Sequence, residues 1–315
     1  MARRLSARRC IFLTVSIPIR PLRILQQNTA LLYIGHRGWM PRKAALRRLI
    51  ETLQAGDWDL VALSEVFRLS ERDQLVDALK KTLPHVVYGP EGSRFPPRLP
   101  GGLLLLSRFP LMEPRFCVCR DNAGVDSWAN KGLLLARWRM PHWPASLVLA
   151  LAHTQNPDAM GLEMNRDVTQ RQVEEMGRFI AAETEETDAI LLMGDLNTDA
   201  HERQRTAAPR AKNTYAHLRM QFKGYADLWT NLAPADAPGI TFDDAGTFRE
   251  GMSRSFEHPG RYRKGQRLDY FLARNGTQGG PVYRDIQVEV LQHEPGLEIS
   301  DHYGLSVSVD GWKAP

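Results

Sequence analysis

Two kinds of apolar pattern alternate along the chain, and together they predict an α/β fold. Short continuous apolar runs are typical of buried strands. They occur at 22–26, 59–64, 85–88, 101–107, 115–119, 132–138, 147–152, 189–193, 268–273, 286–291 and 303–309. Amphipathic stretches with apolar residues three or four positions apart separate several of these runs and predict helices.

Local signals support the predicted helices. The first is expected to begin near Pro41, because proline fits the first turn of a helix. Ser70 and Asp73 have the spacing of a capping box, which predicts a second helix that ends at Leu79. Further helices are predicted at 168–183 and near 215–222, and the polar stretch 198–213 is predicted to be a loop.

The sequence favours a single domain. It has no linker rich in proline, glycine or serine and no internal repeat. Residues 21–315 are therefore expected to form one domain with a large mixed sheet system, after an extension over residues 1–20. A length of 315 residues with 43% hydrophobic residues is sufficient for a sizeable core.

The charge balance changes when the extension is considered separately. A formal net charge of +5 and a pI near 9.2 favour a nucleic-acid partner at first. Five of the 41 basic residues, however, are arginines within residues 1–20, which contain no acid. The other 36 basic residues equal the 36 acidic residues in number, so residues 21–315 are formally neutral. A basic face for DNA would have to come from local clustering.

The extension itself resembles a targeting segment. Residues 10–19 form a short apolar run after four arginines, as in a weak signal peptide or a shortened membrane anchor. The run is shorter than the ~20 residues that span a bilayer, and no small-residue cleavage site follows it. The protein is expected to be secreted or membrane-associated if this segment is a signal. It is expected to be cytoplasmic if the segment is a disordered extension, or if the start codon has been assigned too early and the segment is not translated.

The cysteines provide no disulfide framework. They are Cys10, Cys117 and Cys119. The last two lie two positions apart on a predicted strand, with their side chains on one side, and such pairs rarely form a bridge. Cysteine usage therefore leaves the redox compartment open.

Polar residues suited to metal binding or proton transfer lie at the ends of the predicted strands. They are Asn28, Glu65, His153, Asp195, Asn197, Asp269, Asp301 and His302. Each one alone is compatible with a turn, a helix cap or a structural role. Their joint occurrence favours a functional site, because α/β proteins collect ligands at strand ends.

This set of residues suits the hydrolysis of a phosphate ester. Glu65 and Asn28 offer hard oxygen ligands for Mg²⁺, and the sequence has no Cys/His spacing for zinc. Two histidines on different strands would supply a base and an acid or a donor to the transition state. A metal with amide and imidazole donors would stabilise the charge that develops on the phosphoryl group.

Five short motifs resemble the endonuclease/exonuclease/phosphatase superfamily, whose fold is also called deoxyribonuclease I-like. They are Gln27-Asn28, Leu63-Ser64-Glu65-Val66-Phe67, Gly194-Asp195-Leu196-Asn197, Leu268-Asp269-Tyr270 and Ser300-Asp301-His302. They occur in the family's order and span nearly the whole chain after residue 20. The resemblance implies a four-layer α/β/β/α sandwich of two mixed β-sheets flanked by helices.

The resemblance also implies a metal site. Glu65 would be the principal ligand of Mg²⁺, or of another divalent cation such as Mn²⁺ or Co²⁺, and Asn28 would assist it. Asp301 would lie near the metal or near the catalytic base.

Catalytic roles follow from the same resemblance. His302 would be the general base that takes a proton from the attacking water, and Asp269 would orient it. Asp195 would position the water, Asn197 would hold a phosphate oxygen, and His153 would stabilise the transition state. The reaction would be a single in-line step without a covalent intermediate.

Three segments resemble bacterial neutral sphingomyelinases within this superfamily. They are Glu65-Val66-Phe67 with residues 72–81, residues 101–111, and Asn130-Lys131-Gly132 leading to residues 152–155. This resemblance implies a monomer that hydrolyses sphingomyelin to ceramide and phosphocholine at a membrane surface.

The chain also departs from that branch, which often carries an apolar hairpin before the terminal Ser-Asp-His. Here the corresponding region, 292–299, is short and acidic, and neither Cys117 nor Cys119 has the branch's disulfide partner. The mode of membrane engagement is therefore open. Trp39 is either a partly buried loop anchor or a headgroup contact.

Two other functions remain open at this stage. With the same centre the protein could be a Mg²⁺-dependent endonuclease or exonuclease, or another phosphoesterase of the superfamily. It could also be a catalytically silent binding module, but the complete set of candidate residues argues against that hypothesis.

Overall fold

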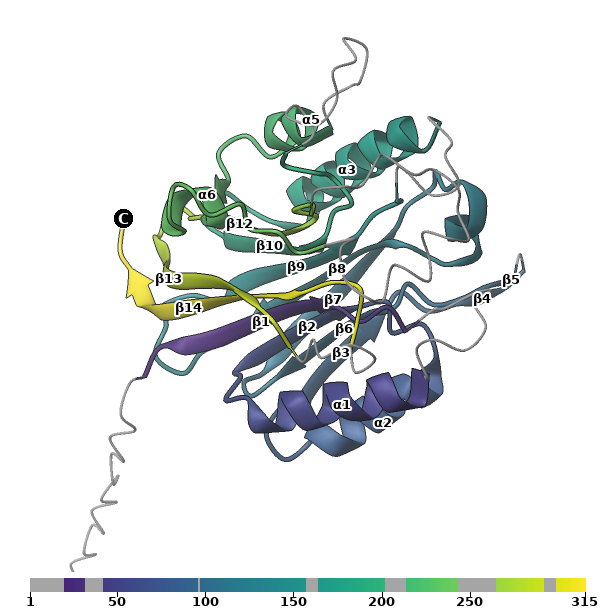
Figure 1. Cartoon of the computed structure of the whole chain (residues 1–315). Coiled ribbons are helices and arrows are strands. Elements are labelled where there is room, and N and C mark those ends of the chain that lie inside the picture. The colour runs from purple at the N-terminus through teal and green to yellow at the C-terminus, as the bar shows by residue number, and fades with distance from the viewer. Residues whose placement is uncertain are drawn as a thin grey trace, which may run out of the picture.

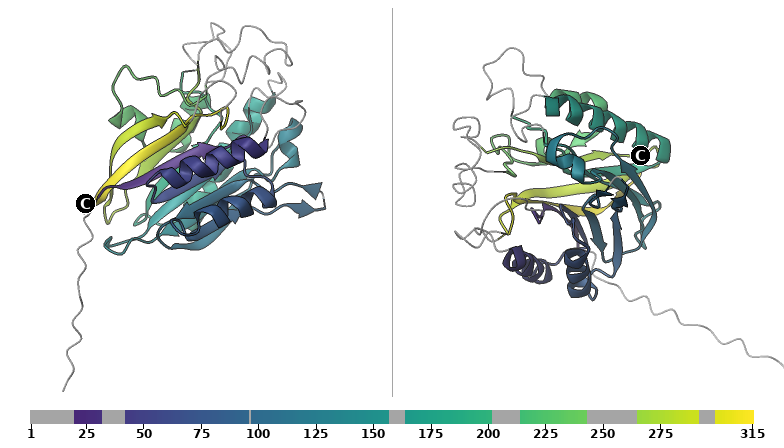
Figure 2. Two further views of the ribbon diagram at one scale, coloured as in Figure 1. Left: turned by 60° about the horizontal axis from the view of Figure 1, so that its bottom comes forward. Right: turned by 90° about the vertical axis from the view of Figure 1, so that its right-hand side faces the viewer.

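The computed structural model describes residues 20–31, 42–95, 97–156, 164–201, 214–242, 265–291 and 299–315. Two six-stranded mixed sheets pack face to face, and helices cover the outer face of each sheet (Figure 1). The four-layer sandwich that the family resemblance implies is therefore confirmed. The right-hand view of Figure 2 shows the layers, with α1 and α2 at the bottom and α3 at the top.

The first sheet has the strand order β13-β14-β1-β2-β6-β3. Its strands are β1 (Leu22–Asn28), β2 (Leu60–Ser64), β3 (His85–Gly89), β6 (Leu103–Ser107), β13 (Gly280–Glu289) and β14 (Gly304–Lys313). β1 is parallel to β2, and all other neighbours are antiparallel. Every residue of β2 and β6 is buried, which explains their continuous apolar sequences.

The second sheet has the order β11-β12-β10-β9-β8-β7. Its strands are β7 (Leu111–Val118), β8 (Gly132–Trp138), β9 (Leu147–His153), β10 (Ala189–Asp195), β11 (Ala226–Asp227) and β12 (Asp269–Arg274). β9 and β10 are parallel, and the other neighbours are antiparallel. Both sheets thus have a central parallel pair flanked by antiparallel strands.

The helices cover the two outer faces. α1 (Arg42–Ala55) and α2 (Leu69–Leu79) pack on the first sheet, whereas α3 (Met164–Glu183) and α5 (Thr214–Gln221) pack on the second. Shorter elements complete the described chain: the hairpin β4 (Ser93–Arg94) and β5 (Pro97–Arg98), the 3-10 helix η1 (Gly124–Trp128) and α6 (Leu228–Leu232).

The apolar core has three parts. The central one joins the sheets and includes Leu105 of β6 and Leu149 of β9. The second lies under α1 and α2, and the third lies under α3 and α5. Since each sheet is covered on both faces, every strand that carries a site residue is fixed from two sides.

Strand direction brings distant parts of the chain to one edge. The carboxyl ends of the parallel pairs carry Asn28, Glu65, His153 and Asp195. β12 and β14 are antiparallel to β10 and β1, so each begins at the edge where its partner ends. Asp269 is the first residue of β12 and lies opposite Asp195 in the register, while His302 lies two residues before the start of β14.

The predicted capping box at Ser70 is wrong. α2 begins at Leu69, and its N-cap residue, Arg68, makes no side-chain cap hydrogen bond. Ser70 lies within the first turn, where its carbonyl accepts a hydrogen bond from the side chain of Gln74. A tertiary contact holds this end instead, because buried Glu71 forms an ion pair with Arg42 of α1.

Other boundaries also differ from the predictions. α3 begins at Met164, before the predicted 168, and β13 covers Gly280–Glu289 rather than 286–291. The β4–β5 hairpin and α6 were not predicted, because elements of two to five residues are too short to show a period.

Several predictions fall outside the described residues. They concern residues 1–19, Trp39, most of the loop 198–213 and the acidic region 292–298. The division into an extension over 1–20 and a domain over 21–315 stays a prediction. Cys117 and Cys119 are free and buried. Within the described ranges, no helix is sufficiently long and apolar to cross a membrane.

A buried ion pair fixes the chain that enters β12. The guanidinium of Arg267 donates two hydrogen bonds to the carboxylate of Asp227, each 2.9 Å long. Both side chains are buried, and Asp227 also caps α6 by accepting hydrogen bonds from two backbone N–H groups. The pair therefore secures the segment that leads directly to Asp269.

Replacing Arg267 by methionine leaves the Asp227 carboxylate buried without its cation. We expect the free energy of unfolding, measured by urea denaturation, to fall by about 3–5 kcal/mol. The double variant Arg267→Met/Asp227→Asn should recover part of the loss, because it buries no unpaired charge. Equal stability of the single and double variants would contradict this account.

Candidate active site

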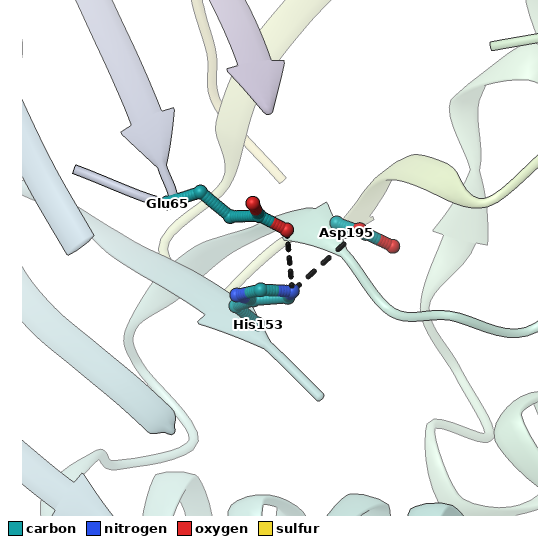
Figure 3. A group of neighbouring side chains, drawn as sticks. All are labelled: Glu65, His153 and Asp195. Carbon is teal, nitrogen blue, oxygen red and sulfur yellow. Dashed lines mark ion pairs between the residues drawn. The ribbon is translucent and has the colours of Figure 1, made fainter. Parts of the chain in front are cut away.

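Two carboxylates and an imidazole meet at the shared edge of the two sheets. Figure 3 shows Glu65 of the first sheet approaching His153 and Asp195 of the second. The Nε2 atom of His153 lies 3.6 Å from Oε1 of Glu65 and 3.7 Å from Oδ2 of Asp195. The ligand atoms of these three residues all lie within 4.8 Å of one another, which is a spacing that a metal ion can bridge.

Asn28 connects the carboxylates of the two sheets. Its Nδ2 atom donates hydrogen bonds to Oε1 of Glu65, at 3.0 Å, and to Oδ2 of Asp195, at 2.9 Å. Its Oδ1 atom accepts from the backbone N–H of Ala30 at 3.0 Å, which fixes the plane of the amide. The side chain is buried, so it holds both acids in one orientation.

The backbone at the edge is unusual. Glu65 has φ +64° and Asn197 has φ +45°, both in the left-handed region that side chains other than glycine rarely adopt. Gly194 has φ +127°, and a Cβ atom there would lie 2.0 Å from the carbonyl oxygen of Ala152. The close approach of β9 to β10 therefore requires glycine directly before Asp195. Backbone strain of this kind clusters at functional sites.

The donor set fits a divalent cation. Burial, with a contribution from nearby Asp301, raises the pKa of Glu65 to about 7. Burial also raises the pKa of Asp195 to about 6, and the charge of Asp269 contributes. Two acids that resist ionisation gain a counter-charge when a cation binds between them.

Two of the three predicted metal ligands lie in this group of residues, and the third does not. Glu65 and Asn28 lie within this group of residues, whereas Asp301 lies outside the three-residue cluster and acts on Glu65 through its charge. His153 and Asp195, predicted to serve catalysis, belong to the cluster. The predicted roles themselves stay predictions.

His302 and Asp269 form a buried pair beside the cluster. The Nδ1 atom of His302 lies 2.8 Å from Oδ2 of Asp269, which makes Nδ1 the donor and directs Nε2 away from the pair. Gln26 donates from Nε2 to the other carboxylate oxygen at 2.8 Å. Nε2 of His302 lies 3.7 Å from Oδ2 of Asp195, which is too long for a direct hydrogen bond and suits a water held between them.

The charge around His302 favours its protonated form in the metal-free protein. Burial alone would lower the pKa of His302, but the carboxylates of Asp269 and Asp195 raise it to about 10. A base must be neutral to accept a proton. Removal of the excess negative charge at this edge is therefore a condition for His302 to act as a base.

Asn197 lies at the turn after β10. Its backbone N–H donates to Oδ1 of Asp195 at 2.9 Å, and its side-chain Nδ2 donates to the carbonyl of Thr154 at 3.0 Å. These bonds tie the turn after β10 to the end of β9. Asn197 is buried next to Asp195, and its role in holding a phosphate oxygen stays a prediction.

Lys131 is a site residue to which the sequence assigned no role. Its Nζ atom lies 3.2 Å from Nε2 of His153 and 3.0 Å from Oδ2 of Asp126, and it donates to the carbonyl of Thr154 at 3.2 Å. Because an ammonium group only donates, Nε2 of His153 is the acceptor and the imidazole proton lies on Nδ1. Burial, and then the charge of Lys131, lower the pKa of His153 well below its usual value, so His153 is neutral.

The residues that support His302 and Asp269 were also missed. The hydroxyl of Thr241 accepts hydrogen bonds from the backbone N–H groups of Leu268 and Asp269, each at 3.1 Å. The ring of Phe242 lies 4.8 Å from the imidazole of His302 between centroids. Neither residue ends a predicted strand, so nothing in the pattern of apolar and polar positions indicated them. Gln26 differs, since its place within β1 two residues before Asn28 was a usable signal.

Metal affinity should depend on pH, because protons compete for the same carboxylates. With pKa values raised to about 6 for Asp195 and about 7 for Glu65, both acids become better ligands as the pH rises through that range. In titration calorimetry, the Kd for Mg²⁺ should fall as the pH rises past these two pKa values. At higher pH the Kd should become constant. Glu65→Gln should weaken binding and remove the part of the pH dependence that comes from Glu65. A Kd that stays constant between pH ~5 and pH ~8 would contradict the assignment.

The charge of Lys131 can be tested on His153. Lys131→Met removes a buried cation next to the imidazole, so the pKa of His153 should rise, and Lys131→Arg should keep it low. NMR titration of the imidazole resonances measures both. An unchanged His153 titration in Lys131→Met would show that burial alone sets this pKa.

Comparison with known proteins agrees with this geometry. The model of the endonuclease/exonuclease/phosphatase family matches residues 33–302, whereas no curated protein sequence matches the chain. Sphingomyelinase C from Streptomyces griseocarneus is similar in structure with a TM-score of 0.65 and 23% identity, covering 92% of this chain and 99% of that one.

Two further solved structures show the same fold. A beta toxin mutant from Staphylococcus aureus with bound magnesium ions has a TM-score of 0.65 and 17% identity, with 92% and 99% of the two chains covered. TDP2 from Caenorhabditis elegans has a TM-score of 0.61 and 14% identity, with 92% of this chain and 74% of that one covered. Since the family model matches most of its length, this chain belongs to the endonuclease/exonuclease/phosphatase family of divalent-metal-dependent, hydrolytic phosphoesterases.

Proposed function

We propose that this protein is a Mg²⁺-dependent phosphodiesterase that hydrolyses sphingomyelin to ceramide and phosphocholine. One observation carries the hydrolytic part of the proposal: the His302–Asp269 pair faces the cluster of Glu65, His153 and Asp195 at one buried edge. A base with its orienting acid, opposite a site for a cation, is what the attack of water on a phosphodiester needs.

The substrate class rests on a different observation. Sphingomyelinase C is similar to this chain with a TM-score of 0.65 and 23% identity, whereas TDP2 from Caenorhabditis elegans is similar with a TM-score of 0.61 and 14% identity. The three sphingomyelinase-like segments of the sequence add to this support. Two of them border the site, since one contains Glu65 and another contains Lys131, which contacts His153.

The cation would be held chiefly by Glu65, with Asn28 and Asp195 beside it and Asp301 nearby. When bound, it would withdraw charge from the phosphoryl oxygens and offset the negative charge that keeps His302 protonated. Mg²⁺ is the preferred ion because two of the three cluster residues are carboxylates, and Mn²⁺ or Co²⁺ could replace it.

The protein's own groups would then carry the proton and orient the reactants. Nε2 of His302 takes a proton from a water positioned by Asp195, and Asp269 keeps Nδ1 as the donor. The water oxygen forms a bond to phosphorus while the bond from phosphorus to the ceramide oxygen breaks on the opposite side. The ceramide oxygen takes up a proton from solvent water as it leaves, and His302 then releases its proton to solvent.

Two residues would stabilise the charge on the phosphoryl oxygens. Asn197 is predicted to hold one of them through its amide, and His153 acts together with Lys131. Because His153 is neutral and accepts a hydrogen bond from Lys131, the positive charge beside it comes from the ammonium group. A preorganised buried cation stabilises developing negative charge without reorganisation during the reaction.

A nucleic-acid substrate is the second candidate. Structural similarity to TDP2 at a TM-score of 0.61 and the pI near 9.2 favour it. The charge balance of residues 21–315 argues against it, because their 36 basic and 36 acidic residues leave no net attraction to DNA. The same purified protein can be tested on both substrates.

Phosphocholine release from sphingomyelin in detergent micelles is the deciding measurement. We expect release that EDTA abolishes, and we expect His302→Ala to reduce kcat by about 10³-fold with little change in the Kd for Mg²⁺. Asp269→Asn should also reduce kcat, because it disturbs the imidazole orientation while leaving the cluster intact.

Other outcomes have definite meanings. EDTA-sensitive nicking of plasmid DNA without phosphocholine release would replace the sphingomyelinase proposal by the nuclease. An equal loss of metal affinity in His302→Ala and Glu65→Gln would show that the division into base and metal ligand is wrong.

A further inference from the structure

Two exposed aromatic side chains lie at the active-site edge of the sheets. Phe95, in the turn between β4 and β5, is 94% exposed, and Trp128 at the end of η1 is 55% exposed. Neither belongs to the three apolar cores. Single exposed apolar side chains are common on protein surfaces, whereas two aromatic rings at the edge that carries the site form a candidate contact surface.

Strand direction places both residues at that edge. β3 is antiparallel to β6, and β6 is antiparallel to β2, so β3 ends where β2 ends, next to Glu65. The β4–β5 hairpin lies in the connection between β3 and β6 and projects beyond the sheets, at the right of Figure 1. η1 precedes β8, whose first residue, Gly132, is paired with His153.

Hydrogen bonds join the hairpin to η1 and to the site. The N–H of Leu99 donates to the carbonyl of Trp128 at 2.7 Å, and the N–H of Asn130 donates to the carbonyl of Leu99 at 3.0 Å. The side chain of Asn130 donates to the carbonyl of Glu91 at the hairpin base, at 2.7 Å. The next residue is Lys131, which contacts His153. The hairpin is therefore fixed relative to the site.

The charge beside the aromatic residues is positive. Arg94 and Arg98 flank the hairpin turn, and neither guanidinium has a carboxylate partner among the described residues. Aromatic side chains next to arginines are the composition of membrane-interface contacts, in which rings enter the headgroup boundary and guanidiniums meet phosphates. We name Arg94, Phe95, Arg98 and Trp128 the hairpin surface.

We propose that the hairpin surface docks the protein on a phospholipid bilayer and holds the active site at headgroup level. Phe95 and Trp128 enter the boundary between headgroups and acyl chains, and the two arginines contact lipid phosphates. This inference rests on the proposed function, because a sphingomyelin phosphodiester lies in the headgroup layer. His153, Asp195 and His302 are buried, so docking would bring the edge that carries them to the headgroup layer in which this bond lies.

Binding can be measured separately from hydrolysis. The metal-free protein in EDTA is sedimented with vesicles of sphingomyelin and phosphatidylcholine. The double variant Phe95→Ser/Trp128→Ser should lower the vesicle partition coefficient by about tenfold, since two interfacial aromatic rings are lost. Phe95→Leu should retain most of the binding, because the side chain stays apolar. Met220→Ser is the matched control, since Met220 is 68% exposed on α5 and should have no effect.

Hydrolysis gives a second readout. The double variant should cleave sphingomyelin in vesicles more slowly than the parent, yet cleave a soluble phosphodiester such as bis-p-nitrophenyl phosphate at the parent's rate. Equal loss on both substrates would overturn the docking role and indicate a disturbed site. Vesicle binding that is unchanged in the double variant, or lost equally in Met220→Ser, would also overturn it.

The two proposals fail in different ways. A parent that binds vesicles through the hairpin surface but releases no phosphocholine supports docking and refutes the sphingomyelinase reaction. If the parent releases phosphocholine and the double variant matches it in vesicle binding and in hydrolysis, the reaction is supported and docking is refuted. If Arg94→Glu/Arg98→Glu abolishes DNA binding by a parent that ignores vesicles, the surface is a nucleic-acid contact and the membrane proposal is wrong.

Discussion

The site depends on a contact between the two sheets at their common edge. The amide of Asn28, at the end of β1, donates to one carboxylate from each sheet, Glu65 and Asp195. Burial raises the pKa of both acids, with contributions from Asp301 to Glu65 and from Asp269 to Asp195. The central core fixes the relative position of the strands, and the amide converts this position into a defined arrangement of ligands. The other side chains of the site, among them His153, His302 and Asp269, lie around these two carboxylates.

Electrostatics divides the two histidines into different roles. His302 is paired with Asp269 and near Asp195, and its pKa is raised to about 10, while His153 lies beside Lys131 and its pKa is far below normal. The two imidazoles thus differ in charge because the groups beside them carry opposite charges. A bound cation would act on the two in the same direction, since it adds positive charge, but only His302 is protonated to the charged form. Under the proposed role of His302 as the base, metal binding and activation of the base are coupled.

Sequence patterns predicted much of this protein and missed its contacts across elements. Continuous apolar runs located β2, β9 and β10 within one or two residues, since strands buried on both faces exclude polar side chains. A site formed by Asn28, Glu65, His153, Asp195 and His302 was predicted because α/β proteins collect ligands at strand ends. The supporting groups could not be predicted. Thr241 and Lys131 reach the site only through tertiary packing, and the hairpin that carries Phe95 is too short to show a repeating pattern of apolar residues. Likewise, the false capping box at Ser70 followed a local rule that the contact of Glu71 with Arg42 overrides.

The division of the site between two sheets has a consequence for distant mutations. A slip of one residue in the packing of the sheets would displace Glu65 from Asp195 by about 3.3 Å, more than the tolerance of a metal site. The turnover rate therefore depends strongly on how the two sheets are aligned. Substitutions in the middle of the central core, at Leu105 or Leu149 for example, can impair the reaction while the molecule is still folded.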